Sequence, residues 1–225
     1  MKKYLFAILI IILPGYALHA GEPAPSSFDI KLGFSYFNVG HHSPEEAALD
    51  SSYAFNLGLD KYFSLGFETG LNWTRWDCYS PRAEKSGLEP GDRKTAADAL
   101  TLPLMLNAVV HYDLRKDYFI MPYVAAGAGY SWSFFFHPDQ DKNYGGFTWQ
   151  VMAGTSIQPR KDYFVEMILE AGYRGSSLTA REGYKLDLSG FVFRAGVRFS
   201  LGRLGKLNGE EPESPAMENE ATSPQ

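Results

Sequence analysis

Two arginines, Arg194 and Arg198, lie four residues apart in the apolar segment FVFRAGVRF near the end of the chain. A guanidinium can bind a carboxylate through two parallel N–H groups, and such pairs suit a confined site. In an antiparallel pair of strands, the numbers of directly opposed residues have a constant sum. Glu166 with Arg198 and Glu170 with Arg194 both sum to 364. We therefore predict that one register opposes both Glu–Arg pairs.

The same register opposes apolar residues on the other face of the two strands, Val165 with Phe199 and Met167 with Val197. Polar and apolar pairs separate in this way because successive side chains of a strand point to opposite faces. We interpret the charges as a structural network of ion pairs that closes an interior, with a path for protons or ions as the functional alternative. The charged residues that share the face of the glycines and serines in their segments are Glu68, Glu166, Glu170, Arg174, Arg194 and Arg198.

Two loop segments carry the residue types that bind metal ions. The opening of a calcium loop is suggested by Asp139, Asp141 and Asn143. However, Tyr144 stands where the glycine of such a loop belongs, and Gln150 where its bidentate glutamate belongs. The earlier of the two loops, over residues 39–51, could bind a divalent metal or could be a solvated loop. We predict no metal site in either. The earlier loop contains His41, His42, Glu45, Glu46 and Asp50.

Catalytic and cofactor-binding motifs are not evident. AAGAGY at residues 125–130 lies within an apolar segment, no helix follows it, and it lacks the third glycine of a dinucleotide loop. No Walker sequence or nucleophile elbow is present. His111 is expected beside a short turn, and His137 lies in a loop near two aspartates. A Ser–His dyad could be assembled only by choosing partners freely, so we predict no catalytic residue, no cofactor and no enzyme.

Eight segments of alternating apolar and polar residues must position these charges, and a period of two indicates strands. The connections between them are short and long in turn. The short ones are residues 61–62, 112–117 and 159–162, and the long polar ones are 39–51, 77–98, 134–146 and 175–188. This is typical of a transmembrane barrel with short periplasmic turns and longer extracellular loops. The segments are 28–38, 52–60, 63–76, 99–111, 118–133, 147–158, 163–174 and 189–200.

Aromatic residues favour a bilayer over water around this barrel. Up-and-down threading places four tryptophans near the rim with the long connections and four tyrosines near the rim with the short turns. Aromatic residues that cap the core of a soluble barrel, such as a periplasmic ligand-binding barrel, are the alternative. Since edge amides are costly in hydrocarbon, the first and last strands must pair. The predicted aromatic girdle consists of Trp73, Trp76, Trp132, Trp149, Tyr62, Tyr112, Tyr118 and Tyr163.

The chain ends and the composition set further limits. Residues 1–20, MKKYLFAILIIILPGYALHA, have the charged start, apolar run and small-residue end of a secretory signal peptide. A linker is expected over 21–27, the barrel over 28–204, and a disordered acidic tail over 205–225. Cys78 is the single cysteine, which excludes an intramolecular disulfide. A formal net charge of -5 excludes a generally basic nucleic-acid binder.

Three stretches, LTLPLMLNAVVHYDL (100–114), PYVAAGAGYSW (122–132) and FVFRAGVRF (191–199), resemble the eight-stranded outer-membrane β-barrel domains of diderm bacteria, the OmpA/OmpX-like class. The resemblance implies an all-β, antiparallel, up-and-down barrel in the outer membrane. It also implies contact with outer-membrane lipid and lipopolysaccharide, and insertion by the barrel-assembly machinery through the closing aromatic strand.

We predict a non-enzymatic, monomeric barrel with a structural or surface-interaction role, in which the long loops contact a host or surface ligand and ion pairs close the interior. A narrow porin-like channel for small solutes is the alternative, followed by an enzyme that modifies lipid A.

Overall fold

The computed structural model of the chain describes residues 26–37, 46–60, 62–79, 94–112, 120–136, 142–159, 163–181, 183 and 185–201. The predicted signal peptide and acidic tail lie outside these residues, and β1 begins at Ser27, the last residue of the predicted linker. The strands are β1 (Ser27–Phe37), β2 (Glu46–Gly58), β3 (Phe63–Tyr79), β4 (Lys94–His111), β5 (Ile120–Phe136), β6 (Lys142–Ile157), β7 (Val165–Ala180), β8 (Lys185–Asp187) and β9 (Gly190–Ser200).

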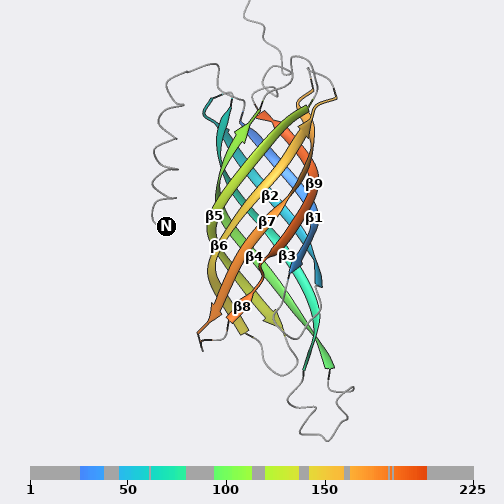
Figure 1. The fold of residues 1–225 in the computed structure, drawn as a ribbon, viewed down its shortest axis with the longest axis vertical. Coiled ribbons are helices and arrows are strands. Elements are labelled where there is room, and N and C mark those ends of the chain that lie inside the picture. The colour runs from blue at the N-terminus through green and yellow to red at the C-terminus, as the bar shows by residue number, and fades with distance from the viewer. Residues whose placement is uncertain are drawn as a thin grey trace, which may run out of the picture.

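The strands form one closed antiparallel sheet, and they run obliquely around the vertical axis of Figure 1. Each strand from β1 to β6 pairs with the next, β6 pairs with β7, and β7 pairs with β9. The ring closes because β1 also pairs with β9, with Phe28 opposite Phe199 and Phe34 opposite Phe193. Pairing of the first and last strands satisfies the edge amides, as a sheet surrounded by hydrocarbon requires.

The strands β8 and β9 are one interrupted strand, so the barrel is eight-stranded. Leu178 opposes Leu186 in β8, and Glu170 opposes Arg194 in β9, so both strands keep the same register with β7. The backbone N–H of Leu188, between them, donates to the carbonyl of Ser176 at 2.9 Å. The prediction of a long loop over residues 175–188 is therefore wrong for most of its length. Instead, β7 and β8 extend the hairpin past the point where β9 begins.

Other strands also begin in segments that the sequence assigns to loops. β2 starts at Glu46 rather than at residue 52, β4 at Lys94 rather than 99, and β6 at Lys142 rather than 147. The alternation of apolar and polar residues fades in these stretches, although their backbones still pair across the sheet. A pattern that depends on the contrast between two faces ends earlier than the hydrogen bonds that define the strand.

The short connection between β2 and β3 is fixed by the side chain of Asp60. Its Oδ1 accepts the backbone N–H groups of Tyr62 at 2.6 Å and Phe63 at 2.7 Å. A short polar side chain that bonds the backbone two and three residues ahead closes a turn without a regular hairpin loop. This turn lies at the opposite end of the barrel from β8, which is near the bottom of Figure 1.

The outer face of the sheet is apolar and the inner face is charged, which is the reverse of a soluble barrel. Along β9, Phe191 is 61% exposed and Phe193 is 52% exposed, whereas Arg194 is 3% exposed. Apolar side chains thus point outward and charged side chains point into the lumen, the interior of the barrel, as in a barrel surrounded by lipid. No helix in the described residues is long and apolar enough to cross a membrane.

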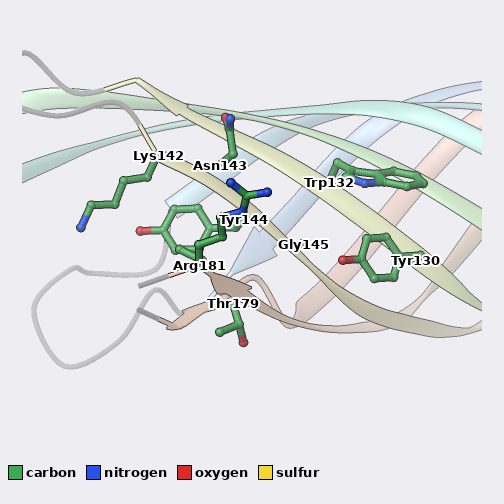
Figure 2. A pocket seen from close by; sticks show the side chains of 9 residues that line it. Tyr130, Trp132, Lys142, Asn143, Tyr144, Gly145, Thr179 and Arg181 are labelled. Carbon is green, nitrogen blue, oxygen red and sulfur yellow. The ribbon is translucent and has the colours of Figure 1, made fainter. Parts of the chain in front are cut away.

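Aromatic side chains lie along the outer wall. Trp73, Trp132 and Trp149 are each about half exposed, and the rings of Tyr130 and Trp132 lie side by side with centroids 4.9 Å apart (Figure 2). Trp149 lies near the middle of β6 rather than near its start, because β6 begins earlier than predicted. Among the predicted tyrosines, Tyr62, Tyr112 and Tyr163 are exposed. The side chain of Trp76 and the whole of Tyr118 lie outside the described residues.

An apolar cluster fills the lumen at the end that carries β8. Leu186 and Leu188 turn inward from the extended hairpin and pack with residues of β1, β2, β4 and β7, while Phe135 and Tyr144 pack against the cluster from β5 and β6. We call this cluster the apolar layer. Its buried members are Phe37, Ala48, Ala97, Ala99, Leu178, Leu186 and Leu188.

Candidate functional site

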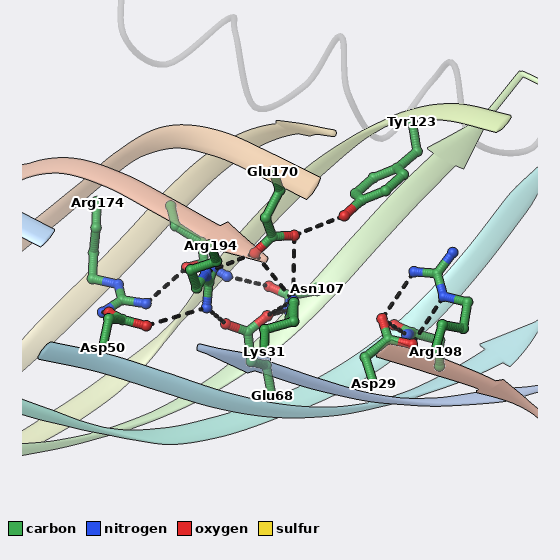
Figure 3. Close-up of polar contacts among 12 residues, drawn as sticks. Asp29, Lys31, Asp50, Glu68, Asn107, Tyr123, Glu170, Arg174, Arg194 and Arg198 are labelled. Atoms are coloured by element: carbon green, nitrogen blue, oxygen red, sulfur yellow. Dashed lines mark hydrogen bonds and ion pairs between the residues drawn. The ribbon is translucent and has the colours of Figure 1, made fainter. Parts of the chain in front are cut away.

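The register between β7 and β9 is the one that the sequence predicts. Glu166 lies opposite Arg198 and Glu170 opposite Arg194, while Val165 lies opposite Phe199 and Met167 opposite Val197. This part of the prediction is confirmed. The ion pairs reach further across the lumen than one pair of strands, as Figure 3 shows.

Arg194 lies at the centre of the lumen and contacts three carboxylates. Its Nη1 is 2.7 Å from Oε1 of Glu68 and 3.7 Å from Oδ1 of Asp50, and its Nε is 2.6 Å from Oε1 of Glu170. Nη2 donates to Oε1 of Gln150 at 3.3 Å. The side chain of Arg194 has no solvent exposure. One guanidinium therefore joins side chains from β2, β3, β6 and β7 to β9.

Lys31 completes a ring of alternating charges around Arg194. Its Nζ lies 3.4 Å from Glu68 and 3.2 Å from Glu170, the two glutamates that also contact the arginine. Neutral donors add to both carboxylates, since the side-chain amide of Asn107 donates to Glu68 and the hydroxyl of Tyr123 donates to Glu170, each at 2.8 Å. Buried charges are stable only when they are paired and hydrogen-bonded in this way.

Arg174 forms a second group with Asp50, nearer the apolar layer. Its Nη1 donates to Oδ2 of Asp50 at 2.7 Å, and its Nη2 donates to Gln150 at 3.3 Å. The same Oδ2 accepts from Ser35 at 2.9 Å and from the amide of Asn72 at 2.8 Å. Gln150 thus bridges Arg174 and Arg194 through one carbonyl oxygen.

Arg198 binds a carboxylate on β1, which flanks β9 on one side, and not on β7, which flanks it on the other side and was expected to supply the partner. Its Nε and Nη2 donate to the two oxygens of Asp29 in β1 at 2.9 and 2.8 Å, which is the bidentate geometry. Asn56 donates to Asp29 at 3.0 Å, and the guanidinium lies 5.3 Å from the ring centre of Tyr123. Glu166 keeps its place opposite Arg198 and accepts a hydrogen bond from Ser156.

Sequence reasoning missed three charged members of the network, Asp29, Lys31 and Asp50. Asp29 and Lys31 share the inward face of Ser35 in β1, so the parity argument applied to them too. In the β1–β9 register, Asp29 lies opposite Arg198. A constant sum of residue numbers, which predicted the pair of Glu166 and Arg198, could have been applied to this pair as well. Asp50 was assigned to a loop, because the second strand was started at residue 52.

The early loop cluster of histidines and carboxylates therefore loses Asp50, which is buried inside the barrel and bound to Arg174. His41, His42 and Glu45, as well as Asp139 and Asp141 of the other loop, lie outside the described residues. Within the part of the chain that the structure describes, no three His, Cys, Asp or Glu side chains are grouped to hold a metal ion.

The charges of the lumen nearly cancel. Its buried acids are Asp29, Asp50, Glu68, Glu166 and Glu170, and its buried bases are Lys31, Arg174, Arg194 and Arg198. In the part of the chain that the structure describes, five negative and four positive groups leave a formal charge of -1, with histidine counted as neutral. Each of the eight barrel strands contributes at least one side chain to the charged network or to the polar groups bonded to it. The arrangement can hold the wall together and fill the cross-section.

A small cavity lies beside these groups. A cavity between Arg174, Asn72 and Leu188 measures about 10 Å³, which is room for about one water molecule. Near the other end, the hydroxyl of Ser64 lies 3.0 Å from Nε2 of His111. Both side chains are buried, so this pair is enclosed in the wall of the lumen and is not placed to meet a large substrate.

Comparison with known proteins now adds to this geometry. The family described as outer membrane protein beta-barrel domain has a model that matches residues 5–199 of the chain. The chain belongs to this family. It is accordingly an outer-membrane protein, and the predicted fold class and location are confirmed. Its wall contacts membrane lipid.

Solved structures of outer-membrane proteins are also similar to the chain. Neisserial surface protein A is 12% identical, with 80% of this chain and 99% of that chain covered and a TM-score of 0.54. OprG from Pseudomonas aeruginosa is 10% identical, with 80% and 97% covered and a TM-score of 0.49. The attachment invasion locus protein Ail of Yersinia pestis is 14% identical, with 78% and 99% covered and a TM-score of 0.44. The first of these likenesses shows the fold alone. A comparison with curated proteins gives no match.

Proposed function

We propose that this member of the family is a closed, non-conducting barrel that anchors an interaction surface at the end carrying β8. The observation that supports the closed state is the position of Arg194, which contacts carboxylates of β2, β3 and β7 across the whole lumen. Its function then resides in what the long connections contact outside the membrane, a host or surface ligand, and not in transport through the interior.

The physics of an ion in the lumen supports the same conclusion. A solute that enters from the end with β8 meets the apolar layer, where an ion loses its hydration without gaining a partner. Beyond it, the solute meets charges that are already paired to one another, and separating a buried pair costs about 3–5 kcal/mol. Both barriers lie in series on the same axis.

Strand lengths support an exposed end. The strands β3, β5 and β6 continue beyond Trp73, Trp132 and Trp149 toward that end. If the tryptophans mark the membrane interface, the ends of these strands extend out of the lipid. The fold neighbour with the highest of the three TM-scores quoted above is named a surface protein, in keeping with this orientation.

Conductance across a planar lipid bilayer tests the closed lumen. We expect no current steps from the wild-type protein, once a heat-shifted gel band has shown that it is folded. A Leu178→Ala, Leu188→Ala, Arg194→Ala variant should give steps, because it removes both barriers. Steps of similar size from the wild-type protein would establish the narrow channel instead.

Labelling of intact cells tests the orientation. In a Cys78→Ser background, Lys185→Cys lies beside the turn of the extended hairpin and Pro159→Cys lies at the opposite end, and both positions are exposed. A membrane-impermeant maleimide should label Lys185→Cys only. Labelling of Pro159→Cys alone would place the surface on the periplasmic side and would end the proposal.

A further inference from the structure

A cavity of about 750 Å³ lies where β5, β6 and β7 approach the end with β8 (Figure 2). Five of the side-chain positions that line it belong to the outward register, and they include Tyr130, Trp132, Gly145 and Thr179. Lys142, Tyr144 and Ala180, which also line it, take inward positions. None of the lining residues belongs to the charged network of the lumen, so the cavity lies beside the outer wall at the rim of the barrel.

A glycine forms the floor of this cavity. Trp132, Gly145 and Thr179 oppose one another on three adjacent strands, so the missing side chain of Gly145 leaves a furrow between the indole and the threonine. The hydroxyl end of Tyr130 reaches over the glycine, and a Cβ added there would lie 2.4 Å from its Oη. The furrow is thus lined on one side by two aromatic rings.

The part of the cavity nearest the chain connections is cationic. Lys142, the first residue of β6, and Arg181, which directly follows β7, both line it, and Arg181 is exposed. Among the residues that the structure describes, none of those lining the cavity is acidic. Figure 2 shows both cations and Tyr144 on the side of the chain connections, and Tyr130 and Trp132 farther along the barrel wall. The site therefore changes from positive and polar to aromatic along the barrel axis.

We propose that this cavity binds one phosphorylated glycolipid of the outer leaflet. Lys142 and Arg181 would bind a phosphate of the headgroup, and an acyl chain would pass Trp132 and Tyr130 toward the membrane. The occupant is argued from two facts. An outer-membrane wall is bathed in lipid, and indole and phenol rings prefer the boundary between headgroups and hydrocarbon. Two cations beside that boundary complement an anionic headgroup, since guanidinium groups bind phosphate through paired hydrogen bonds. The inference goes beyond the proposed function, because it concerns the wall and not the connections.

Native mass spectrometry of the mature chain, released from micelles that contain a bisphosphorylated lipid A, tests the site. We expect one bound lipid per barrel, and binding that is at least about tenfold weaker for the same glycolipid without phosphates. The Lys142→Ala, Arg181→Ala variant should lose about tenfold in affinity. Gly145→Val should also weaken binding, because it fills the furrow and leaves both cations in place. Lys185→Ala is the matched control, since it removes an exposed cation at the same end that does not line the cavity.

Three results would overturn the proposal. These are equal affinity in the double variant and Lys185→Ala, equal affinity for the dephosphorylated lipid, and displacement of the lipid by millimolar inorganic phosphate alone. A heat-shifted gel band for each variant shows that weak binding is not loss of fold. Conductance and cysteine labelling need no added glycolipid, so failure of this site and failure of the closed surface barrel are distinguishable.

Discussion

Arg194 shows why a membrane barrel keeps charges in an interior that could have been apolar. Buried ion pairs add little net stability compared with packed apolar residues, but they can specify one arrangement among several. A slip of two residues between β7 and β9 would keep each side chain on its own face. It would, however, place Arg194 opposite Ile168 or Gly172 instead of Glu170. We infer that the lumen charges select the register during closure of the barrel.

Substitution of single lumen charges should have unequal effects. Arg194→Met leaves Glu68 and Glu170 without their shortest ion pairs and takes the formal lumen charge from -1 to -2. We expect a loss of about 3–5 kcal/mol in the free energy of unfolding. Glu170→Gln takes the charge to 0 and leaves Lys31 and Arg194 with Glu68, so the loss should be about 1–3 kcal/mol.

Urea titration of the folded protein in lipid vesicles measures both losses, with Leu169→Met on the outer face of β7 as the control. If both lumen variants unfold at the wild-type urea concentration, their ion pairs are not buried from solvent. A larger loss of unfolding free energy in Glu170→Gln than in Arg194→Met would contradict the explanation from charge balance.

At the scale of elements, the parts of the barrel that depend on one pair of strands were predictable. The β7–β9 register follows from two Glu–Arg pairs with one sum, and the structure has it. The partner of Arg198 was not predictable from that pair, because β9 lies between β7 and β1 and only closure of the barrel brings Asp29 beside it. Asp50 was missed for a different reason. The apolar pattern ends before the strand does, so an inward residue looked like part of a loop.

The tip of the extended hairpin rests on one glycine. Gly183 has a φ of +84°, a left-handed conformation, and its N–H donates to the carbonyl of Ala180 at 2.9 Å. No heavy atom lies within 4 Å of a Cβ built there, so the cost of a side chain is one of backbone conformation alone. Gly183→Ala should lower the free energy of unfolding by about 1 kcal/mol, and Gly183→Asn by less, because Asn adopts this conformation more readily.

The same vesicle assay checks this pair of variants. Equal unfolding free energies for the wild type and Gly183→Ala would mean that the turn between β7 and β8 relaxes without the left-handed residue.

At the scale of the whole molecule, the barrel separates two environments with one alternating sequence. The outer wall is apolar and bears aromatic rings, while the lumen holds nine buried charges among the residues that the structure describes, with a formal sum of -1. The alternation alone could not decide which face was inside, since a soluble barrel has the same period. The aromatic residues near the two rims, and the charges that share the face of the glycines and serines, indicated which face is inside.

The surroundings of the outer wall can be tested with two positions that differ in depth but not in exposure. Leu106 and Tyr112 lie on the outer wall at and just beyond β4, and they are 71% and 65% exposed. Leu106 lies between the aromatic belts, and Tyr112 lies in the belt beside the short turns. In lipid, Leu106→Arg should lower the free energy of unfolding by about 2–4 kcal/mol, and Tyr112→Arg by about 1 kcal/mol or less, because the cost of a charge on the lipid face falls toward the interface.

If the wall faced water, both arginines would be solvated and both changes would stay within about 0.5 kcal/mol. Equal small losses in the vesicle titration would therefore overturn the assignment of the outer wall to lipid, and a loss confined to Leu106→Arg would place Leu106 deeper in the membrane than Tyr112.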